Sequence, residues 1–246
     1  MKKFYLIFLP IFFLFFSCAT LDIGEFYEPF ISTENIPASC RLGKQKPKIL
    51  ASNDIDNDVL AFRADKYYRI MGCSIFEADK YEDDEISEAI EEFCEDVDIP
   101  VGIYSRIYST TEKTTSYSYY YSQYGSFSTP RTVRNDRYNY IIYLLAPYSK
   151  NEISNWHLGL SVRNLNPDER KEIKRNTGAF VTTVFNDFPA FYADIAYGDI
   201  IIAVNNVQIK DSQDFKNVEQ NLKNGDKISI TYLRFGEKHT VDLISK

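Results

Sequence analysis

Histidine, cysteine and basic residues are all scarce in this sequence. Its 246 residues contain two histidines and four cysteines, too few for us to expect a His/Cys metal site. Lys and Arg total 28 against 35 Asp and Glu, a formal net charge of -7. Nucleic-acid binding needs a basic face, so this balance argues against nucleic acid as a partner. We also expect no small-molecule cofactor.

Aromatic and apolar residues are abundant by contrast. Hydrophobic residues make up 44% of the chain, which is enough to build a sizeable core. The 19 Tyr and 18 Phe favour a β-rich structure. A chain of this length forms one large domain or two small ones.

The N-terminal segment has the features of a secretory signal. Lys2 and Lys3 precede an apolar run over residues 4–16, which is shorter than the roughly 20 residues that a membrane-spanning helix needs. Residues 14–18, which end in Ser17-Cys18, resemble the lipobox of bacterial lipoproteins, although Phe15 stands where Leu is usual. The resemblance implies a signal peptide over residues 1–17 and lipidation of Cys18, with palmitate among the acyl chains. An ordinary cleaved signal is the alternative.

A lipidated Cys18 would place the protein in the cell envelope, anchored to a bacterial membrane at the periplasmic face or at the outer membrane. Two acyl chains are enough for stable anchoring, and a lipidated Cys18 would carry more than two. The membrane is therefore an expected partner through the lipid anchor. Residues 18–50 contain Pro29, Pro37 and Pro47 and show no steady periodicity, so we expect a tether there.

Two domains are expected after the tether, over residues 51–150 and 154–246. The first contains helix patterns over 56–64 and 83–97 and strand patterns over 66–76, 101–110 and 137–146. Their order, αβαββ, predicts a small α/β domain and an α+β fold class for the chain. The sequence does not indicate a role for this domain.

Residues 109–133 are dominated by Tyr, Ser and Thr. Alternating small polar and aromatic residues could extend the flanking strands into a long Tyr/Ser-rich hairpin, which would serve as a contact arm. A solvated low-complexity loop is the alternative. Cys73 and Cys94 are a possible disulfide, because both lie in the first domain, although buried free thiols fit equally well.

Residues 154–246 contain a series of spaced motifs. Their main pieces are Leu-Gly-Leu at 158–160, an alternating strand at 178–184, Pro-Ala at 189–190, Gly-Asp-Ile-Ile at 198–201 and Leu-Arg-Phe-Gly at 233–236. Together they resemble a bacterial PDZ domain of the type found in HtrA-like periplasmic proteases, over about a third of the chain. The resemblance implies a partly open β-barrel capped by two helices.

In PDZ domains a partner's C-terminus adds as a strand beside the strand that follows the Leu-Gly-Leu loop, whose N–H groups hold the terminal carboxylate. The resemblance therefore implies a peptide or a protein C-terminus as the partner. The carried-over site comprises Leu158, Gly159 and Leu160 at the carboxylate, Ser161 and Val162 in the ladder, and Phe215, Val218, Glu219 and Leu222 on the opposite wall. Leu158, Leu160, Phe215 and Leu222 could equally be core residues. We expect the substitution Gly159→Pro to abolish peptide binding and to leave the fold largely intact.

The protease domain of the HtrA-like enzymes is missing here. Residues 19–153 contain no histidine, so a Ser–His–Asp or Cys–His centre cannot be assembled there. The sequence therefore favours a non-enzymatic adaptor or scaffold that binds proteins. One alternative is an envelope peptidase with an unfamiliar Ser–Lys centre. Another is a purely structural protein with an occluded groove.

Overall fold

The computed structural model describes residues 21–122 and 125–246, with side chains described outside 117–129. The expected signal peptide and Cys18 lie outside these residues, so both remain predictions. No helix in the described part is long and apolar enough to cross a membrane.

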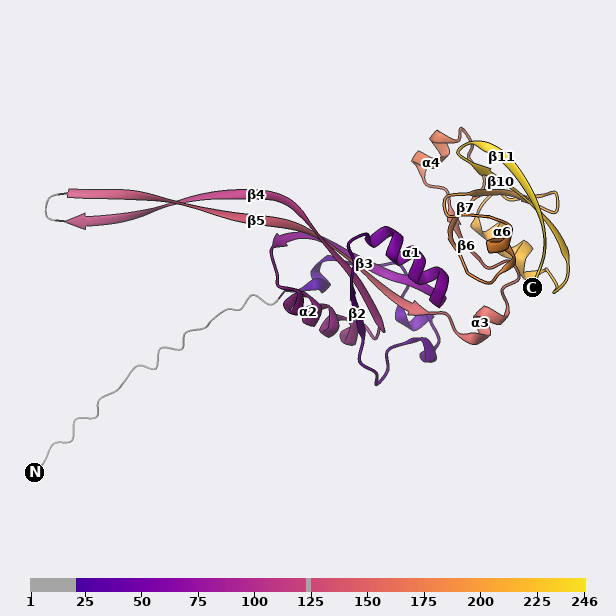
Figure 1. The fold of residues 1–246 in the computed structure, drawn as a ribbon, viewed down its shortest axis with the longest axis horizontal. Coiled ribbons are helices and arrows are strands. Elements are labelled where there is room, and N and C mark those ends of the chain that lie inside the picture. Colours follow the sequence, from indigo (N-terminus) through magenta and orange to yellow (C-terminus); the bar gives the residue numbers. More distant parts are fainter. Residues whose placement is uncertain (1–20, 123–124) are drawn as a thin grey trace, which may run out of the picture.

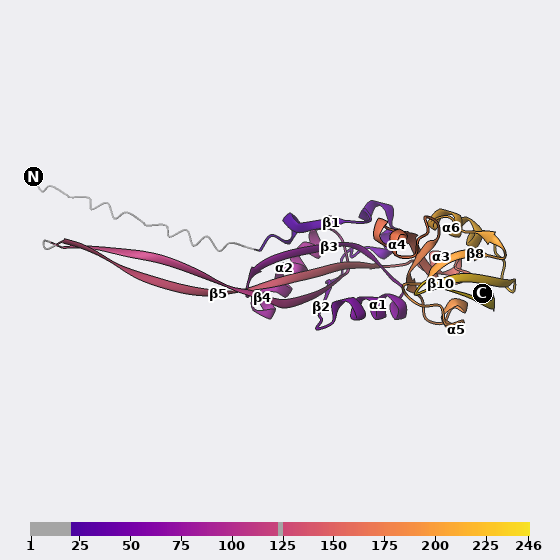
Figure 2. The ribbon, with the colours of Figure 1, turned by 90° about the horizontal axis from the view of Figure 1, so that it is seen from above.

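The first domain is built on a mixed five-stranded sheet (Figures 1 and 2). The strand order is β1-β3-β5-β4-β2, and β2 runs parallel to β4 while the other pairs are antiparallel. The bounds are β1 (Tyr27–Pro29), β2 (Lys48–Ala51), β3 (Tyr68–Asp79), β4 (Val101–Ser122) and β5 (Gly125–Pro147). Helices α1 (Ile55–Lys66) and α2 (Asp83–Asp96) precede β3 and β4, so the elements from α1 to β5 follow one another in the order αβαββ.

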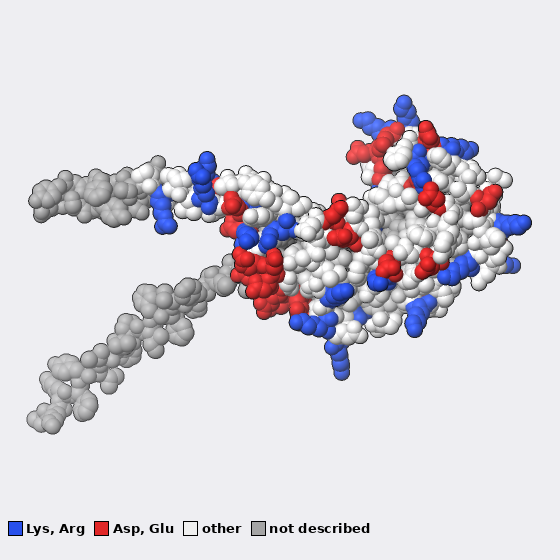
Figure 3. All heavy atoms as spheres, viewed as in Figure 1, with Lys and Arg blue, Asp and Glu red and all other residues white. Residues whose placement is uncertain are grey.

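The two helices of this domain cover opposite faces of the sheet. Ile55 and Val59 of α1 pack in a cluster with Leu145 of β5, whereas Ile86 and Ile90 of α2 pack in a separate, larger cluster. Both clusters use the alternation of side chains along a strand, which sends successive residues to opposite faces. Helix α2 thus buries the face that carries Ile86, Ile90 and Cys94. Figure 3 shows acidic side chains gathered where Figure 1 draws α2.

The tether expected over residues 18–50 is wrong for most of its length. Residues 27–29 and 48–51 form β1 and β2, and short 3-10 helices lie at Ile23–Phe26, Thr33–Asn35 and Ala38–Cys40. Ile23 and Ile36 are buried in the cluster under α2. Strands of three and four residues are too short to show a periodicity, which is why the composition alone suggested a linker.

The Tyr/Ser-rich segment forms the predicted hairpin rather than a loop. β4 and β5 pair from Val101↔Leu145 outward to Ser122↔Gly125, whereas β3 covers β5 only as far as the pair Asp79↔Arg137. Beyond that pair the two strands leave the body as a two-stranded arm (Figure 1). A contact role for this arm remains a prediction.

The possible disulfide between Cys73 and Cys94 is not formed, because both residues, like Cys40, are buried free thiols. Cys73 lies opposite Tyr143 of β5, whose side chain packs in the cluster under α1. Cys94 belongs to α2 and its cluster. Cross-strand partners share a face, so the sheet itself separates the two sulfur atoms.

The second domain is a six-stranded antiparallel sheet whose strand path runs β11-β10-β8-β7-β6, with β9 paired to β8. Its strands are β6 (Leu160–Asn164), β7 (Ala179–Val184), β8 (Ile200–Val204), β9 (Val207–Gln208), β10 (Lys227–Arg234) and β11 (Glu237–Ile244). Its helices are α4 (Pro167–Glu172), α5 (Pro189–Tyr192) and α6 (Ser212–Gln220), and α3 (Lys150–Ser154) lies at the junction. The path has two ends, so the expected barrel is not closed.

An ion pair with a buried carboxylate joins two of the spaced motifs. Asp199 is 1% exposed, and both of its carboxylate oxygens accept hydrogen bonds from Arg234 at 2.8 Å. A buried carboxylate is tolerated when it is paired in this way. Asp194 has a φ of 58°, in the left-handed region that aspartate adopts more readily than most residues.

Candidate functional site

A groove runs beside strand β6 at the edge of the second sheet. One edge of β6 pairs with β7, and no described strand pairs with the other. Helix α6 contacts β6, and the two elements line a groove of about 530 Å³. An edge strand offers unpaired N–H and C=O groups, so the groove has both a backbone edge and side-chain walls.

The structure brings five of the nine predicted site residues together. The groove is lined by Leu160, Ser161, Val162, Phe215 and Glu219. The other four do not line it. Leu158 is a core residue, Gly159 is buried beside it, and Val218 and Leu222 pack against the core from α6 and the segment after it. The roles of all these residues in binding a peptide remain predictions.

The Leu158-Gly159-Leu160 loop is buried and is fixed by backbone hydrogen bonds. Leu158 is fully buried, its carbonyl accepts the N–H of Ala190 at 3.1 Å, and the carbonyl of Gly159 accepts the N–H of Phe185 at 2.9 Å. Gly159 has a φ of 75°, and an added Cβ would lie 2.1 Å from Cβ of Phe188. Proline requires a φ near −65°, so the expectation that Gly159→Pro preserves the fold is wrong.

Glu219 reaches from α6 to this loop. The N–H of Leu158 donates to Oε1 of Glu219 at 3.3 Å. Burial raises the pKa of Glu219 to about 7, and the N–H groups of Leu158 and His157 and the charge of His157 oppose this rise. The carboxyl group therefore titrates near neutral pH, at the end of the groove where PDZ domains bind a terminal carboxylate.

The first domain and the junction supply the far wall of the groove, which the sequence did not predict. Arg69 of β3 donates to both carboxylate oxygens of Glu152, at 2.8 and 2.9 Å, and its guanidinium lies 3.9 Å from the centre of the Tyr148 ring. Burial raises the pKa of Glu152, but hydrogen bonds from Ser149 and Arg69 lower it further, so its pKa falls below the usual value. Ile31 and Trp156 complete the wall.

A local sequence signal for the junction was available. Ser149 and Glu152 form a capping box at the start of α3, since each side chain accepts a hydrogen bond from the other residue's backbone N–H. Asn166 and Glu169 do the same for α4. A polar residue followed three positions later by Glu predicts a helix start, and this spacing is present in the sequence at both places. The approach of Arg69 to Glu152 has no such local signal.

Aromatic side chains fasten the two domains beside the groove. Trp156 stacks on Phe185 with ring centres 4.3 Å apart and meets Tyr148 edge-on at 4.7 Å. Tyr67, at the end of α1, contacts Trp156, Phe185 and Phe188, and its hydroxyl donates to the carbonyl of Asn186 at 3.2 Å. The groove wall is therefore held in place by packing across the junction.

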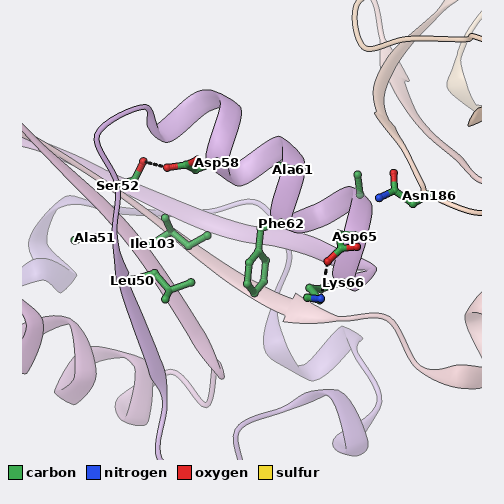
Figure 4. A pocket seen from close by; sticks show the side chains of 11 residues that line it. Leu50, Ala51, Ser52, Asp58, Ala61, Phe62, Asp65, Lys66, Ile103 and Asn186 are labelled. Carbon is green, nitrogen blue, oxygen red and sulfur yellow. Dashed lines mark hydrogen bonds and ion pairs between the residues drawn. The ribbon is translucent and has the colours of Figure 1, made fainter.

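A second cavity, of about 630 Å³, lies between α1 and β2 (Figure 4). Leu50, Phe62 and Ile103 point into it, and at its rim the hydroxyl of Ser52 donates to Asp58 at 2.7 Å. In the described residues, no group of three His, Cys, Asp or Glu side chains is placed to hold a metal ion. Neither cavity therefore shows a metal centre.

Comparison with known families identifies the second domain. Residues 157–244 match the family model described as "PDZ domain". The C-terminal region is thus a PDZ domain, with homology to a region of a DegP-like protein, and the match leaves the rest of the chain uncovered.

The curated relatives include a protein named "Probable periplasmic serine endoprotease DegP-like" in two strains of Pseudomonas putida. Each is 28% identical over 94 residues, which is 37% of this chain and 20% of the relative. The chain therefore spans only about a fifth of the length of these relatives.

Solved structures with a similar region include the PDZ domain of HtrA3 bound to a phage-derived ligand, with 20% identity and a TM-score of 0.33. That match covers 37% of this chain and 85% of the other. The HtrA-type protease AlgW with a tripeptide is 23% identical with a TM-score of 0.35, over 42% of this chain and 39% of the other.

Proposed function

We propose that the PDZ domain binds peptide segments of other proteins by strand addition to β6. The observation that carries this proposal is the free edge of β6, which faces α6 across a groove of about 530 Å³. A peptide that pairs with β6 gains main-chain hydrogen bonds, and the groove side chains select among sequences.

The walls of the groove suit an extended peptide with mixed side chains. Val162 and Trp156 provide apolar surface, while Lys216 and Gln220 on α6 provide polar groups. Arg69 and Tyr148 stand on the opposite wall, so residues of a bound peptide would contact the first domain as well. We therefore expect the whole chain to bind with a selectivity that the isolated PDZ domain lacks.

The wider role we propose is that of a non-enzymatic adaptor or scaffold, lipid-anchored in the cell envelope. The absence of histidine from residues 19–153 supports a role without a Ser–His–Asp centre. The apolar run that ends at Cys18 supports the anchor, and the name of the curated relatives, which describes them as periplasmic, fits that location.

Peptide binding is tested with an array of pentapeptides, each immobilised through its N-terminus and carrying either a free or an amidated C-terminus. The protein used is the chain from residue 19 to 246. Lys216→Trp fills the groove from an exposed position on α6, so we expect binding to fall about tenfold or more.

Gln213→Trp is the matched control, since Gln213 is exposed on the same helix and does not line the groove. Equal loss of binding in both variants, or no binding by the wild-type chain, would contradict groove binding.

The lipid anchor is tested by Cys18→Ser. We expect the wild-type chain to fractionate with membranes and to carry acyl chains on an N-terminal Cys18, and the variant to lose both. An unmodified N-terminus at Ala19, found by mass spectrometry, would contradict the anchor and leave peptide binding untouched.

A further inference from the structure

One N–H group of the loop that binds the ligand's carboxylate in PDZ domains is already used within the domain. The N–H of Leu158 donates to Glu219 at 3.3 Å. Leu158, Gly159 and Leu160 are all buried, and the N–H groups of Phe185 and Ala190 donate to the carbonyls of Gly159 and Leu158. The loop therefore cannot open outward without breaking these contacts.

Helix α6 holds the Glu219 carboxylate at that position. Phe215 is 1% exposed and anchors the helix in the core, and Glu219 follows it by four residues, which places both on one face. Both side chains line the groove. Glu219 thus presents its carboxylate at the end of the groove where a ligand's terminal carboxylate would arrive.

An ionised Glu219 disfavours a second carboxylate at this position. The other ionisable groups around it are His157 at the loop, Lys246, which bonds to His157, Lys216 on α6 and the Arg69–Glu152 pair across the groove. Arg69 is already engaged by both oxygens of Glu152. An ionised ligand terminus would therefore meet an ionised Glu219 without a free arginine between them, and like charges at short range repel.

We propose that Glu219 fills the carboxylate position of the loop, so that the groove takes internal peptide segments in preference to free C-termini. This inference rests on the proposed peptide binding. An internal segment continues past the loop as a neutral backbone, so it brings no second charge to Glu219. The carboxylate of Glu219 occupies the position of the ligand's terminal carboxylate, and β6 supplies main-chain hydrogen bonds to an internal peptide segment.

The test compares the two forms of each pentapeptide in the array near pH 8, where Glu219 is ionised. We expect the wild-type chain, residues 19–246, to bind the amidated form about tenfold more tightly than the free acid. Glu219→Gln removes the charge at nearly constant shape and should bring the two affinities close together. Glu237→Gln is the control, since Glu237 is exposed in the second domain and outside the groove, and it should keep the wild-type ratio.

Two failures can be told apart. The preference for internal segments would be overturned if Glu219→Gln left the ratio of the affinities for the acid and amide forms unchanged. It would also be overturned if the wild-type chain bound the free acids more tightly. Either result would leave peptide binding itself in place. No binding of either form by any variant would remove the proposed function and the preference with it.

A second measurement needs no peptide. The amide resonance of Leu158 should shift with pH in the wild-type chain, with a midpoint near 7, and stay constant in Glu219→Gln. A Leu158 amide that does not titrate would overturn the contact on which the preference depends.

Discussion

Strands β2 and β6 each end a sheet beside a cavity, yet their surroundings differ. At β2, helix α2 contacts the strand on one face of the sheet and α1 packs on the other face against β3, β4 and β5, so both helices cover faces of the sheet. At β6, helix α6 packs against β6 and β7 and lines the groove beside the free edge. A free edge alone offers only backbone groups, which any strand could pair with. The comparison teaches that the helix across the groove, rather than the free edge, marks β6 as a selective binding site.

The largest effect is expected from Gly159→Ala, which should disrupt the groove beside β6. The added Cβ would lie 2.1 Å from Phe188 in a backbone with a φ of 75°, so the loop and α5 cannot both keep their positions. We expect a destabilisation of about 3 kcal/mol or more in the PDZ domain. Hydrogen exchange should show β6 and β7 losing protection while β3 and β5 keep theirs.

Gly198→Ala is the control for backbone strain alone. Gly198 has a φ of 89° and nothing lies within 4 Å of its added Cβ, so we expect a cost of about 1 kcal/mol. Similar costs for the two alanine variants would show that the contact with Phe188 is not what holds the loop.

The same two edges show what the sequence could predict. The alternating strand expected over residues 178–184 is β7, Ala179–Val184, because apolar alternation marks it locally. β2 has four residues and no periodicity of its own, and its place is set by parallel pairing with β4. The PDZ side of the groove follows from the motif, whereas the Arg69 wall depends on contacts between distant residues, which no local pattern records.

The next largest effect is expected from separating the two domains. We predict that residues 154–246 fold alone, but with a free energy of unfolding roughly 2–3 kcal/mol lower than in the whole chain, because Trp156 and Phe185 lose their contacts with Tyr67 and Tyr148. Fluorescence of Trp156, the one tryptophan, reports this unfolding. Tyr148→Ala in the whole chain should show an intermediate loss. An equal stability of fragment and whole chain would contradict the fastening of the groove wall.

A smaller effect concerns Glu219 and pH. Its folded pKa is about 7, above the ordinary 4.5, so the folded chain binds more protons between these values and stability falls as the pH rises through that window. Glu219→Gln should therefore be more stable than wild type near pH 8 by about 1–2 kcal/mol, with a smaller difference near pH 5. Denaturant unfolding at both values measures this. Parallel stability curves for the two proteins would contradict a raised pKa at Glu219.

The smallest effect is expected at the cysteines of the first domain. Burial raises the pKa of Cys94 to about 12 and also raises that of Cys73, and only the thiolate reacts. We expect thiol reagents near pH 8 to leave both unmodified in the folded chain and to label them after unfolding. Reducing agent should leave thermal stability unchanged. A disulfide between Cys73 and Cys94, found in a proteolytic digest of the chain, would contradict the separation of these thiols by the sheet.

The most direct test of the central claim compares the two edges in one experiment. Hydrogen exchange of the chain from residue 19 to 246 is measured with and without the tightest-binding amidated pentapeptide from the array. We expect added protection at β6, in Leu160–Asn164, and none at β2, in Lys48–Ala51. Protection at β2, or a bound peptide that leaves the amides of β6 unchanged, would contradict strand addition in the groove between β6 and α6.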